Sequence, residues 1–235
     1  MKTIVIVGLG ALGSHVVQAL RNLKYKIKLV DFDVVEQKNT LSQFHSNMVL
    51  RRNKAQAMQQ TMQGLWGVKV EAVSSKLVDN NAQALLGGAT LVIDCTDNIA
   101  ARTCLGTFCT ANDIPLLHGA MSADGTFARA IWSDWFKPDA ESGNGATCED
   151  GENLPFHLLA GSAIAQAAKT FLTKRRCLLI GDETSRIKTP DSKRTILAIK
   201  AAAFAPFRRI LNGTPVPNGP FDIYSQVKFL DANFW

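Results

Sequence analysis

Residues 3–13 have the sequence TIVIVGLGALG, a β-branched run that leads into three closely spaced glycines. The run predicts a buried strand, and apolar residues at helical spacing over residues 12–23 predict a helix directly after it. Gly8, Gly10 and Gly13 therefore lie at a strand-to-helix turn. Glycines in this setting let the backbone turn tightly and approach a phosphate, to which the helix N-terminus offers N–H donors. The stretch thus predicts a nucleotide-binding α/β fold.

The chain continues to alternate between short apolar runs and helical patterns. Strands are predicted at residues 27–30, 68–73, 90–93, 115–117 and 126–132, and helices around residues 55–65, 99–111 and 158–172. Strands that alternate with helices predict a Rossmann-like α/β fold, a mostly parallel sheet with helices on both faces.

Two stretches depart from this alternation. Residues 133–153 are polar and rich in Gly, Asp and Glu, which predicts a long crossover-type surface loop. Residues 177–235 are expected to form a C-terminal antiparallel extension, in which residues 196–207 fit a helix, although the sequence does not place this extension. We expect residues 1–235 to form a single domain.

Composition narrows the class of protein. The chain has 235 residues, 46% of them hydrophobic, enough for one globular core. No apolar run approaches the roughly 18 residues of a membrane span, and no secretory leader is predicted. Five cysteines without Cys-x-x-Cys pairs predict no zinc site and favour a reducing, cytoplasmic setting. The net charge of +6 fits either solvated basic faces or attraction to an acidic or phosphate-bearing partner.

The second predicted strand ends at Asp31, about 20 residues after the glycines, where an acidic residue accepts hydrogen bonds from a ribose. A tight turn followed by a structural carboxylate is the alternative. These features do not separate ATP from NAD. The chain contains no G-x-x-x-x-G-K-[ST] motif, so a P-loop is excluded.

Five further segments occur in the order in which they appear in a known family. They are Leu29–Glu36 with Asn39, Arg51–Ala55, Val92–Asn98 with Arg102, Ile114–Ala120, and Thr147–Gly151 before the helix of residues 158–172. Together with the glycine turn they resemble the ubiquitin-activating-enzyme superfamily of the ThiF/MoeB/HesA type over residues 3–176. The resemblance implies an adenylation domain that uses ATP and Mg²⁺ to activate the C-terminal glycine carboxylate of a ubiquitin-like or sulfur-carrier protein.

The resemblance also implies roles for particular residues. Lys54 would neutralise charge on the α-phosphate, and Asp97 would hold the Mg²⁺. The implied nucleotide contacts are Gly8, Gly10, Gly13, Asp31, Asp33, Asn39, Gln43, Lys54, Asp97 and Asn98. As alternatives, Lys54 is an ordinary solvated helix lysine, and Asp97 is the N-cap of the helix that begins at Ile99.

Cys148 matches the segment that bears the thioester cysteine in some members. Its thiolate would attack the acyl-adenylate, form a thioester and release AMP. A position just before a helix lowers a thiol pKa, whereas the neighbouring Glu149, Asp150 and Glu152 raise it, so a free loop cysteine is the alternative. Cys95, Cys104 and Cys109 are predicted to be packing residues.

One departure from the family pattern concerns a phosphate contact. The family usually has Asn-Leu-x-Arg-Gln where this chain has Asn39-Thr40-Leu41-Ser42-Gln43, so Ser42 occupies the arginine's position. The contact is lost unless Arg51 or Arg52 reaches the nucleotide.

Three other hypotheses remain open: a non-catalytic partner subunit of a heterodimeric activating enzyme, a tRNA-modifying dehydratase of the same superfamily, and a nicotinamide dehydrogenase. The expected partners are a small ubiquitin-fold carrier, a conjugating enzyme or sulfurtransferase, and a second copy of the chain. Neither a membrane nor a nucleic acid is the expected partner.

Overall fold

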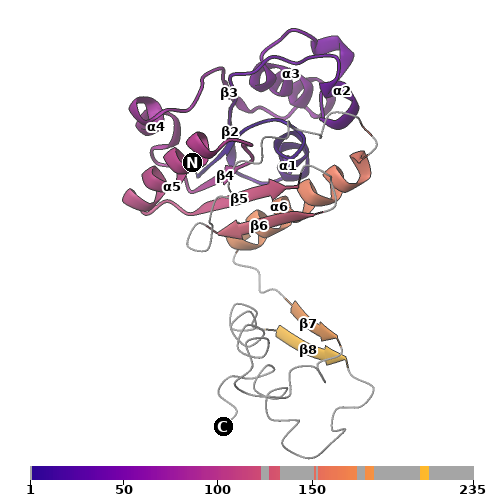
Figure 1. The fold of residues 1–235 in the computed structure, drawn as a ribbon, viewed down its shortest axis with the longest axis vertical. Coiled ribbons are helices and arrows are strands. Elements are labelled where there is room, and N and C mark those ends of the chain that lie inside the picture. The colour runs from indigo at the N-terminus through magenta and orange to yellow at the C-terminus, as the bar shows by residue number, and fades with distance from the viewer. Residues whose placement is uncertain are drawn as a thin grey trace, which may run out of the picture. The chain divides into compact units, whose positions relative to one another are not determined.

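The computed structural model describes residues 2–122, 127–132, 151, 153–173, 178–182 and 207–211. The chain divides into two compact units, residues 1–172 and residues 173–235. Figure 1 shows the elements of both units.

A six-stranded sheet forms the centre of the first unit (Figure 1). Its strands are β1 (Thr3–Val7), β2 (Lys26–Val30), β3 (Glu71–Val73), β4 (Leu91–Asp94), β5 (Leu116–Met121) and β6 (Ala128–Trp132). Their order in space is β3-β2-β1-β4-β5-β6, and only the β5–β6 pair is antiparallel. The register pairs Ile4 with Ile27 on one side and with Leu91 on the other. The chain order reverses between β1 and β4, the switch point beside which open α/β sheets bind ligands.

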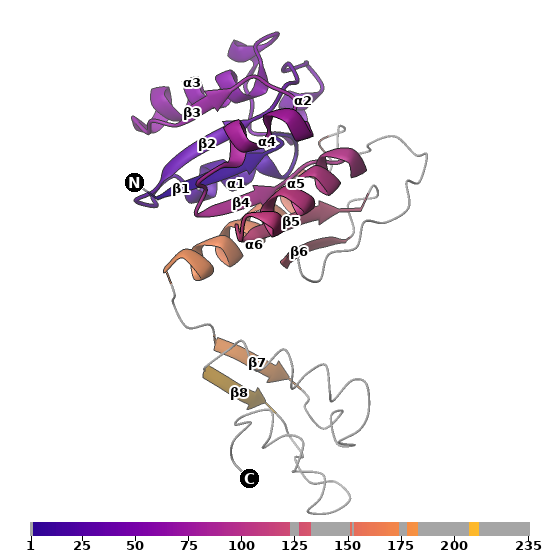
Figure 2. The ribbon, with the colours of Figure 1, turned by 90° about the vertical axis from the view of Figure 1, so that its left-hand side faces the viewer.

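Helices cover both faces of this sheet. They are α1 (Gly13–Leu20), α2 (Asn39–Ser42), α3 (Lys54–Trp66), α4 (Asp79–Leu86), α5 (Ile99–Ala111) and α6 (Leu154–Thr173), with a 3-10 turn, η1 (Asn47–Val49). Ile4 and Ile6 of β1 pack in a core with α1, α3 and α6, whereas Val5 and Val7 pack in a second core with α4 and α5. Figure 2 shows α4 and α5 on the viewer's side of the sheet. Among the described helices, none has the length and apolar character needed to cross a membrane.

The predicted Rossmann-like fold is confirmed, with local differences. Strand β3 begins at Glu71, three residues after the predicted start. Helix α4 was not predicted, because two asparagines interrupt its pattern and it buries only Ala82, Leu85 and Leu86. Leu65, the last residue of the helix predicted around residues 55–65, has 64% of its surface exposed, and α3 continues to Trp66.

The second unit contains β7 (Leu178–Asp182) and β8 (Phe207–Leu211), which pair in parallel. The antiparallel arrangement predicted for this extension is therefore wrong for the described strands. The connection between them is long enough for the crossover that parallel pairing requires. Phe207, the last residue of the predicted helix, instead begins β8, and residues 196–206 lie outside the described ranges, as does most of the predicted loop at residues 133–153.

Candidate functional site

A cavity of about 1070 Å³ lies at the carboxyl ends of β1, β2 and β4. Ligands bind at this edge of open α/β sheets, and the volume is at the upper end of the range for small-molecule sites. Of the residues predicted to contact a nucleotide, the cavity is lined by Gly8, Gly10, Asp31, Asp33, Asn39, Gln43, Lys54, Asp97 and Asn98. Gly13 does not line it.

The three glycines of the turn after β1 have different constraints. A Cβ on Gly8, whose φ is +85°, would lie 2.8 Å from the carbonyl carbon of Cys95. A Cβ on Gly13 would lie 1.8 Å from the carbonyl oxygen of Gly8. At Gly10 the nearest atom would be Nε2 of Gln43, at 4.0 Å. Packing therefore requires glycine at positions 8 and 13, whereas at position 10 the protein itself leaves room and only a ligand would need the space.

Asp31 joins the end of β2 to the glycine turn. Its carboxylate accepts a hydrogen bond from the Leu9 N–H at 2.6 Å and another from the Asp33 N–H at 2.8 Å. Burial raises the pKa of Asp31, and the two N–H donors and the nearby Lys54 oppose this effect. Since a carboxylate has about four acceptor positions, Asp31 keeps capacity for a ribose hydroxyl while it holds the turn.

Lys54 is the first residue of α3 and is buried, with 9% of its surface exposed. Its Nζ lies 3.4 Å from Oδ2 of Asp33, whose side chain is half-exposed at the cavity. The alternative of a solvated surface lysine does not hold. A buried ammonium group that lines a cavity is suited to meet an anion there.

Asn53 fixes the position of Lys54, a role that the sequence analysis did not assign. Its Oδ1 accepts hydrogen bonds from the N–H groups of Ala55 and Gln56, so it is the N-cap of α3. Its Nδ2 donates to the carbonyl oxygens of Asp31 and Asp33. An asparagine directly before a helix is a cap signal that the sequence did contain.

Helix α2 brings two predicted residues to the cavity. Asn39 is 4% exposed, and its Oδ1 accepts a hydrogen bond from the Glu36 N–H at 2.9 Å. Gln43 lines the cavity near Gly10, and among the described residues its buried Oε1 has no hydrogen-bond partner. Both amides remain able to contact a ligand.

Ser42 lies between these residues in the chain but does not line the cavity. It is fully buried, and its carbonyl oxygen accepts a hydrogen bond from Nε2 of His15 at 3.0 Å. Two further bonds hold the same segment: Phe44 N–H to Ser14 Oγ at 2.9 Å, and Nε2 of His45 to the Leu9 carbonyl at 3.0 Å. The position of the family's arginine is therefore buried.

Burial lowers the pKa of both histidines that hold this segment, and it lowers that of His45 to about 4. Both are neutral at pH 7 and keep their Nε2–H for the backbone carbonyls.

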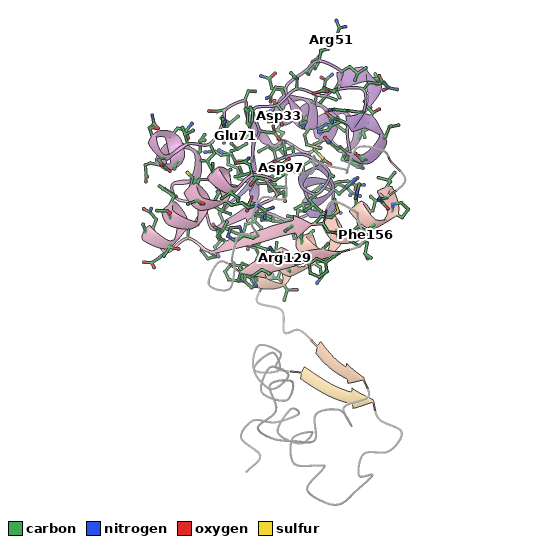
Figure 3. The ribbon with its side chains drawn as sticks, in the orientation of Figure 1. Asp33, Arg51, Glu71, Asp97, Arg129 and Phe156 are labelled. Atoms are coloured by element: carbon green, nitrogen blue, oxygen red, sulfur yellow. The ribbon has the colours of Figure 1, made fainter. Side chains whose placement is uncertain are left out.

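The alternative arginines do not reach the cavity. Arg51 is exposed in a separate surface pocket, and Figure 3 shows it projecting away from Asp33 and Asp97. Arg52 donates to Oε1 of Gln60 at 2.7 Å on the surface. The cations that line the cavity beside Lys54 are instead Lys38, Lys76 and Arg102.

Asp97 and Asn98 follow β4. The N-cap of α5 is Asn98, whose Oδ1 accepts a hydrogen bond from the Ala101 N–H at 2.8 Å. The alternative that Asp97 is this N-cap is therefore wrong. Asp97 is exposed at the cavity, on the same edge of the sheet as Asp33 (Figure 3). The cap leaves the Asp97 carboxylate available for a ligand.

A buried polar network lies directly beneath Asp97. Oδ1 of Asp94 accepts hydrogen bonds from the N–H and the hydroxyl of Thr96, at 2.8 and 2.7 Å. Nδ1 of His118 lies 2.6 Å from Oδ2 of Asp94 and donates to it. Arg102 donates from Nε and Nη2 to the Thr96 carbonyl, at 3.0 and 2.5 Å. These residues lie within the motifs at residues 92–102 and 114–120, and the bonds between them do not follow from the sequence.

The residues of the site fit Mg²⁺ that is bound to a nucleotide, and not Mg²⁺ held by protein ligands alone. Among the described residues, no group of three or more His, Cys, Asp or Glu side chains is arranged to hold a metal. Mg²⁺ bound to a nucleotide commonly uses one or two carboxylates and takes its other oxygens from phosphates and water. The exposed carboxylate of Asp97 meets that requirement together with a triphosphate.

The three described cysteines are packing residues, as predicted. Cys95, Cys104 and Cys109 are buried, and burial raises the pKa of Cys104 to about 11 and that of Cys109 to about 12. Burial raises the pKa of Cys95 as well. Cys148, the predicted thioester cysteine, lies outside the described residues.

The sheet order and the cavity at its switch point define a Rossmann-like α/β protein with a ligand site. The family model of the ThiF family matches residues 1–202, and the chain belongs to that family.

Two curated relatives are similar to part of the chain. The molybdopterin-synthase adenylyltransferase of Salmonella typhimurium is 31% identical over 120 residues, which cover 50% of this chain and 48% of the relative. The SAMP-activating enzyme E1 of Haloferax volcanii is 33% identical over 121 residues, 50% of this chain and 45% of the relative. The similarity therefore spans about half the length of these relatives.

Solved structures show the same fold. The tRNA N6-threonylcarbamoyladenosine dehydratase of E. coli, in complex with ATP, has a TM-score of 0.53 at 21% identity and covers 74% of this chain and 88% of its own. E. coli MccB with MccA-N7isoASN has a TM-score of 0.62 at 17% identity, over 74% of this chain and 57% of its own.

Proposed function

We propose that this chain binds Mg·ATP in the cavity and adenylates the C-terminal glycine carboxylate of a small ubiquitin-fold or sulfur-carrier protein. The observation that carries the proposal is the buried Lys54 at a cavity that also presents Asp97 and the open Gly10. Membership of the ThiF family and the names of the two adenylyltransferase and E1 relatives support this activity.

The cavity suits the parts of ATP in turn. The carboxylates of Asp31 and Asp33, at the end of β2, are placed to accept hydrogen bonds from a ribose. The space over Gly10 admits phosphates, with Lys54 to balance their charge. A nicotinamide dinucleotide needs the turn and Asp31, but it gives no reason for a buried lysine and an exposed aspartate beside them.

The reaction transfers an adenylyl group. A carboxylate oxygen of the carrier attacks the α-phosphorus, the bond from that phosphorus to the bridging oxygen breaks, and pyrophosphate leaves. Negative charge builds on the α-phosphate oxygens, where the Lys54 ammonium group stabilises it. Mg²⁺ held by Asp97 would screen and orient the triphosphate. Asn39 and Gln43 would position phosphate or ribose oxygens by hydrogen bonds.

Transfer to Cys148 is the finer part of the proposal. The thiolate would attack the acyl carbon of the adenylate, form a thioester and release AMP. A conjugating enzyme or a sulfurtransferase would accept the activated carrier, and the family resemblance favours a homodimer. These steps follow from the resemblance of Thr147–Gly151 to the thioester segment.

The first test is exchange of labelled pyrophosphate into ATP by the purified full chain. Each small ubiquitin-fold protein encoded beside its gene is supplied as the carrier. We expect exchange that requires both a carrier with an intact C-terminal glycine and Mg²⁺. A carrier truncated by that glycine is the control. If no such carrier supports exchange, the proposal is wrong and a non-catalytic partner subunit is favoured.

A tRNA-modifying dehydratase is the second candidate, favoured by the net charge of +6. Such an enzyme would adenylate a carboxylate on a nucleoside and would bind tRNA with an affinity that falls steeply with salt. ATP consumption that depends on tRNA and not on a carrier protein would select this candidate.

A further inference from the structure

We propose that Asp94 is a positioning residue, which holds Thr96 so that the next residue, Asp97, presents its carboxylate to the metal-bound triphosphate. This inference rests on the proposed function. It adds a role for Asp94, Thr96, Arg102 and His118 that the activity alone does not assign.

Every polar group of Thr96 is bonded to this network. Its N–H and hydroxyl donate to one oxygen of Asp94, and its carbonyl oxygen accepts two N–H groups of Arg102. A residue bonded at its N–H, hydroxyl and carbonyl has little freedom, and the peptide that joins it to Asp97 shares that restraint. On the other side of Asp97, Asn98 is fixed as the cap of α5. Asp97 is therefore an exposed side chain between two fixed neighbours.

Asp94 and His118 form the buried part of this network, whereas Thr96 and Arg102 line the cavity. Asp94 is fully buried and His118 is 2% exposed, and neither lines the cavity. Nε of Arg102 lies 3.9 Å from Oδ2 of Asp94, so the buried carboxylate faces a cation as well as its hydrogen-bond donors. Burial of a carboxylate is costly unless it is paired and hydrogen-bonded. The network meets that condition, so Asp94 acts on the site through Thr96 rather than through a ligand contact.

The network should affect the binding of ATP in the presence of Mg²⁺ and leave the binding of ATP without metal unchanged. Partners behind a metal ligand typically contribute about 10- to 100-fold to metal affinity. If Asp94 and Thr96 orient Asp97, weakening their bond lowers the extent to which Mg²⁺ tightens ATP binding. A merely structural role would instead lower thermal stability and weaken ATP binding with and without metal to the same extent.

Thr96→Val and Thr96→Ser form a matched pair, because valine keeps the shape and loses the hydroxyl, whereas serine keeps the hydroxyl. Calorimetric titration of the full chain with ATP, in Mg²⁺ and in EDTA, gives the ratio of the two Kd values. We expect Thr96→Val to reduce this ratio at least about 10-fold, with the Kd in EDTA unchanged. Thr96→Ser should keep the wild-type ratio, and so should Tyr25→Phe, which removes a remote bond to the Leu172 carbonyl.

Thermal melting shows whether each variant is folded. If Thr96→Val does not fold, the same titration of Asp94→Asn tests the positioning role. The nearly isosteric amide removes the buried negative charge, and we expect the ratio to fall in the same direction. Equal ratios for valine, serine and wild type would overturn the positioning role while ATP binding still stands. An unmodified chain that binds no ATP in either buffer would contradict the proposed function and, with it, this inference.

Discussion

The ends of β2 and β4 use the same local device with different support. Each strand end has a buried aspartate, Asp31 or Asp94, whose Oδ1 accepts the N–H two residues later at 2.8 Å. An aspartate that lines the cavity follows, Asp33 after β2 and Asp97 after β4. The buried carboxylate shapes the loop, and the later one is left for a ligand. Asx turns of this kind let one residue type serve both purposes.

The support behind the two ends differs in charge. Asp31 is held by backbone N–H groups, and neutral histidines fasten the neighbouring segment. Asp94 is held by His118 and faces Arg102. For the aspartates that line the cavity, the charged partner lies at the other strand end. Asp33 lies beside Lys54, whereas Asp97 makes no ion pair within the described part of the chain. We infer that the β2 end recognises the nucleotide, that Lys54 of α3 beside it supplies the cation, and that the β4 end holds the metal.

The largest expected effect comes from removing Lys54, the cation of α3 that lies beside Asp33. Lys54→Ala should lower pyrophosphate exchange about 10²- to 10³-fold, the usual cost of losing one preorganised group that stabilises developing charge. Lys24→Ala, at an exposed lysine, is the control and should exchange like the unmodified chain. Exchange by Lys54→Ala at the control rate would contradict the role of Lys54 in stabilising charge on the phosphates.

The glycine turn separates residues required by packing from residues required by a ligand. Gly13→Ala should destabilise the fold by about 3 kcal/mol or more, because its Cβ would overlap the Gly8 carbonyl oxygen. Gly10→Ala should keep the melting temperature and weaken ATP binding about tenfold, because the added methyl group fills the space over the turn. Chemical unfolding and ATP titration measure the two effects. If Gly10→Ala leaves the ATP affinity unchanged, the phosphates of ATP do not lie over this turn.

The buried, neutral His45, which bonds to the Leu9 carbonyl of the glycine turn, should make the stability of the fold sensitive to acid. The folded chain holds the pKa of His45 at about 4, below the unfolded value of 6.5. Between these values the unfolded chain binds more protons, so stability falls as pH falls from 6.5 to 4, by up to about 3 kcal/mol from this residue. His45→Gln keeps an N–H donor without the titration. Urea unfolding at several pH values should therefore show a shallower acid loss for this variant, and parallel curves would contradict the assignment.

Local patterns predicted much of the site, and contacts distant in sequence did not follow from them. The glycines and Asp31 were expected at one nucleotide site because they follow neighbouring strands of an alternating α/β pattern. Lys54 and Asp97 were expected there because their segments resemble motifs of the family. The Asp94–His118 bond joins β4 to β5, and whether two polar residues on neighbouring strands face each other depends on register. The burial of Ser42 goes with backbone bonds of its segment to His15 and Ser14 of α1. Residue spacing alone carries no signal for such pairs.

Lys38 gives the smallest expected effect and tests how the chain manages with Ser42 in place of the family's arginine. Lys38 lines the cavity next to Asn39, and its Nζ lies 3.5 Å from Oε2 of Glu36. Because its side chain is 47% exposed, solvent screens its charge, and Lys38→Ala should weaken ATP binding only about two- to fivefold. The loss should be greater for ATP than for AMP and should shrink at high salt. Lys69→Ala, an exposed lysine away from the cavity, is the control.

Ser42→Arg provides the converse test of the same substitution. Because Ser42 is fully buried and does not line the cavity, we expect that an added guanidinium reaches the cavity only if the bonds that hold this segment break. We therefore expect a lower melting temperature and no gain in ATP affinity. Tighter ATP binding by this variant, measured by the same titration, would mean that the segment can turn outward.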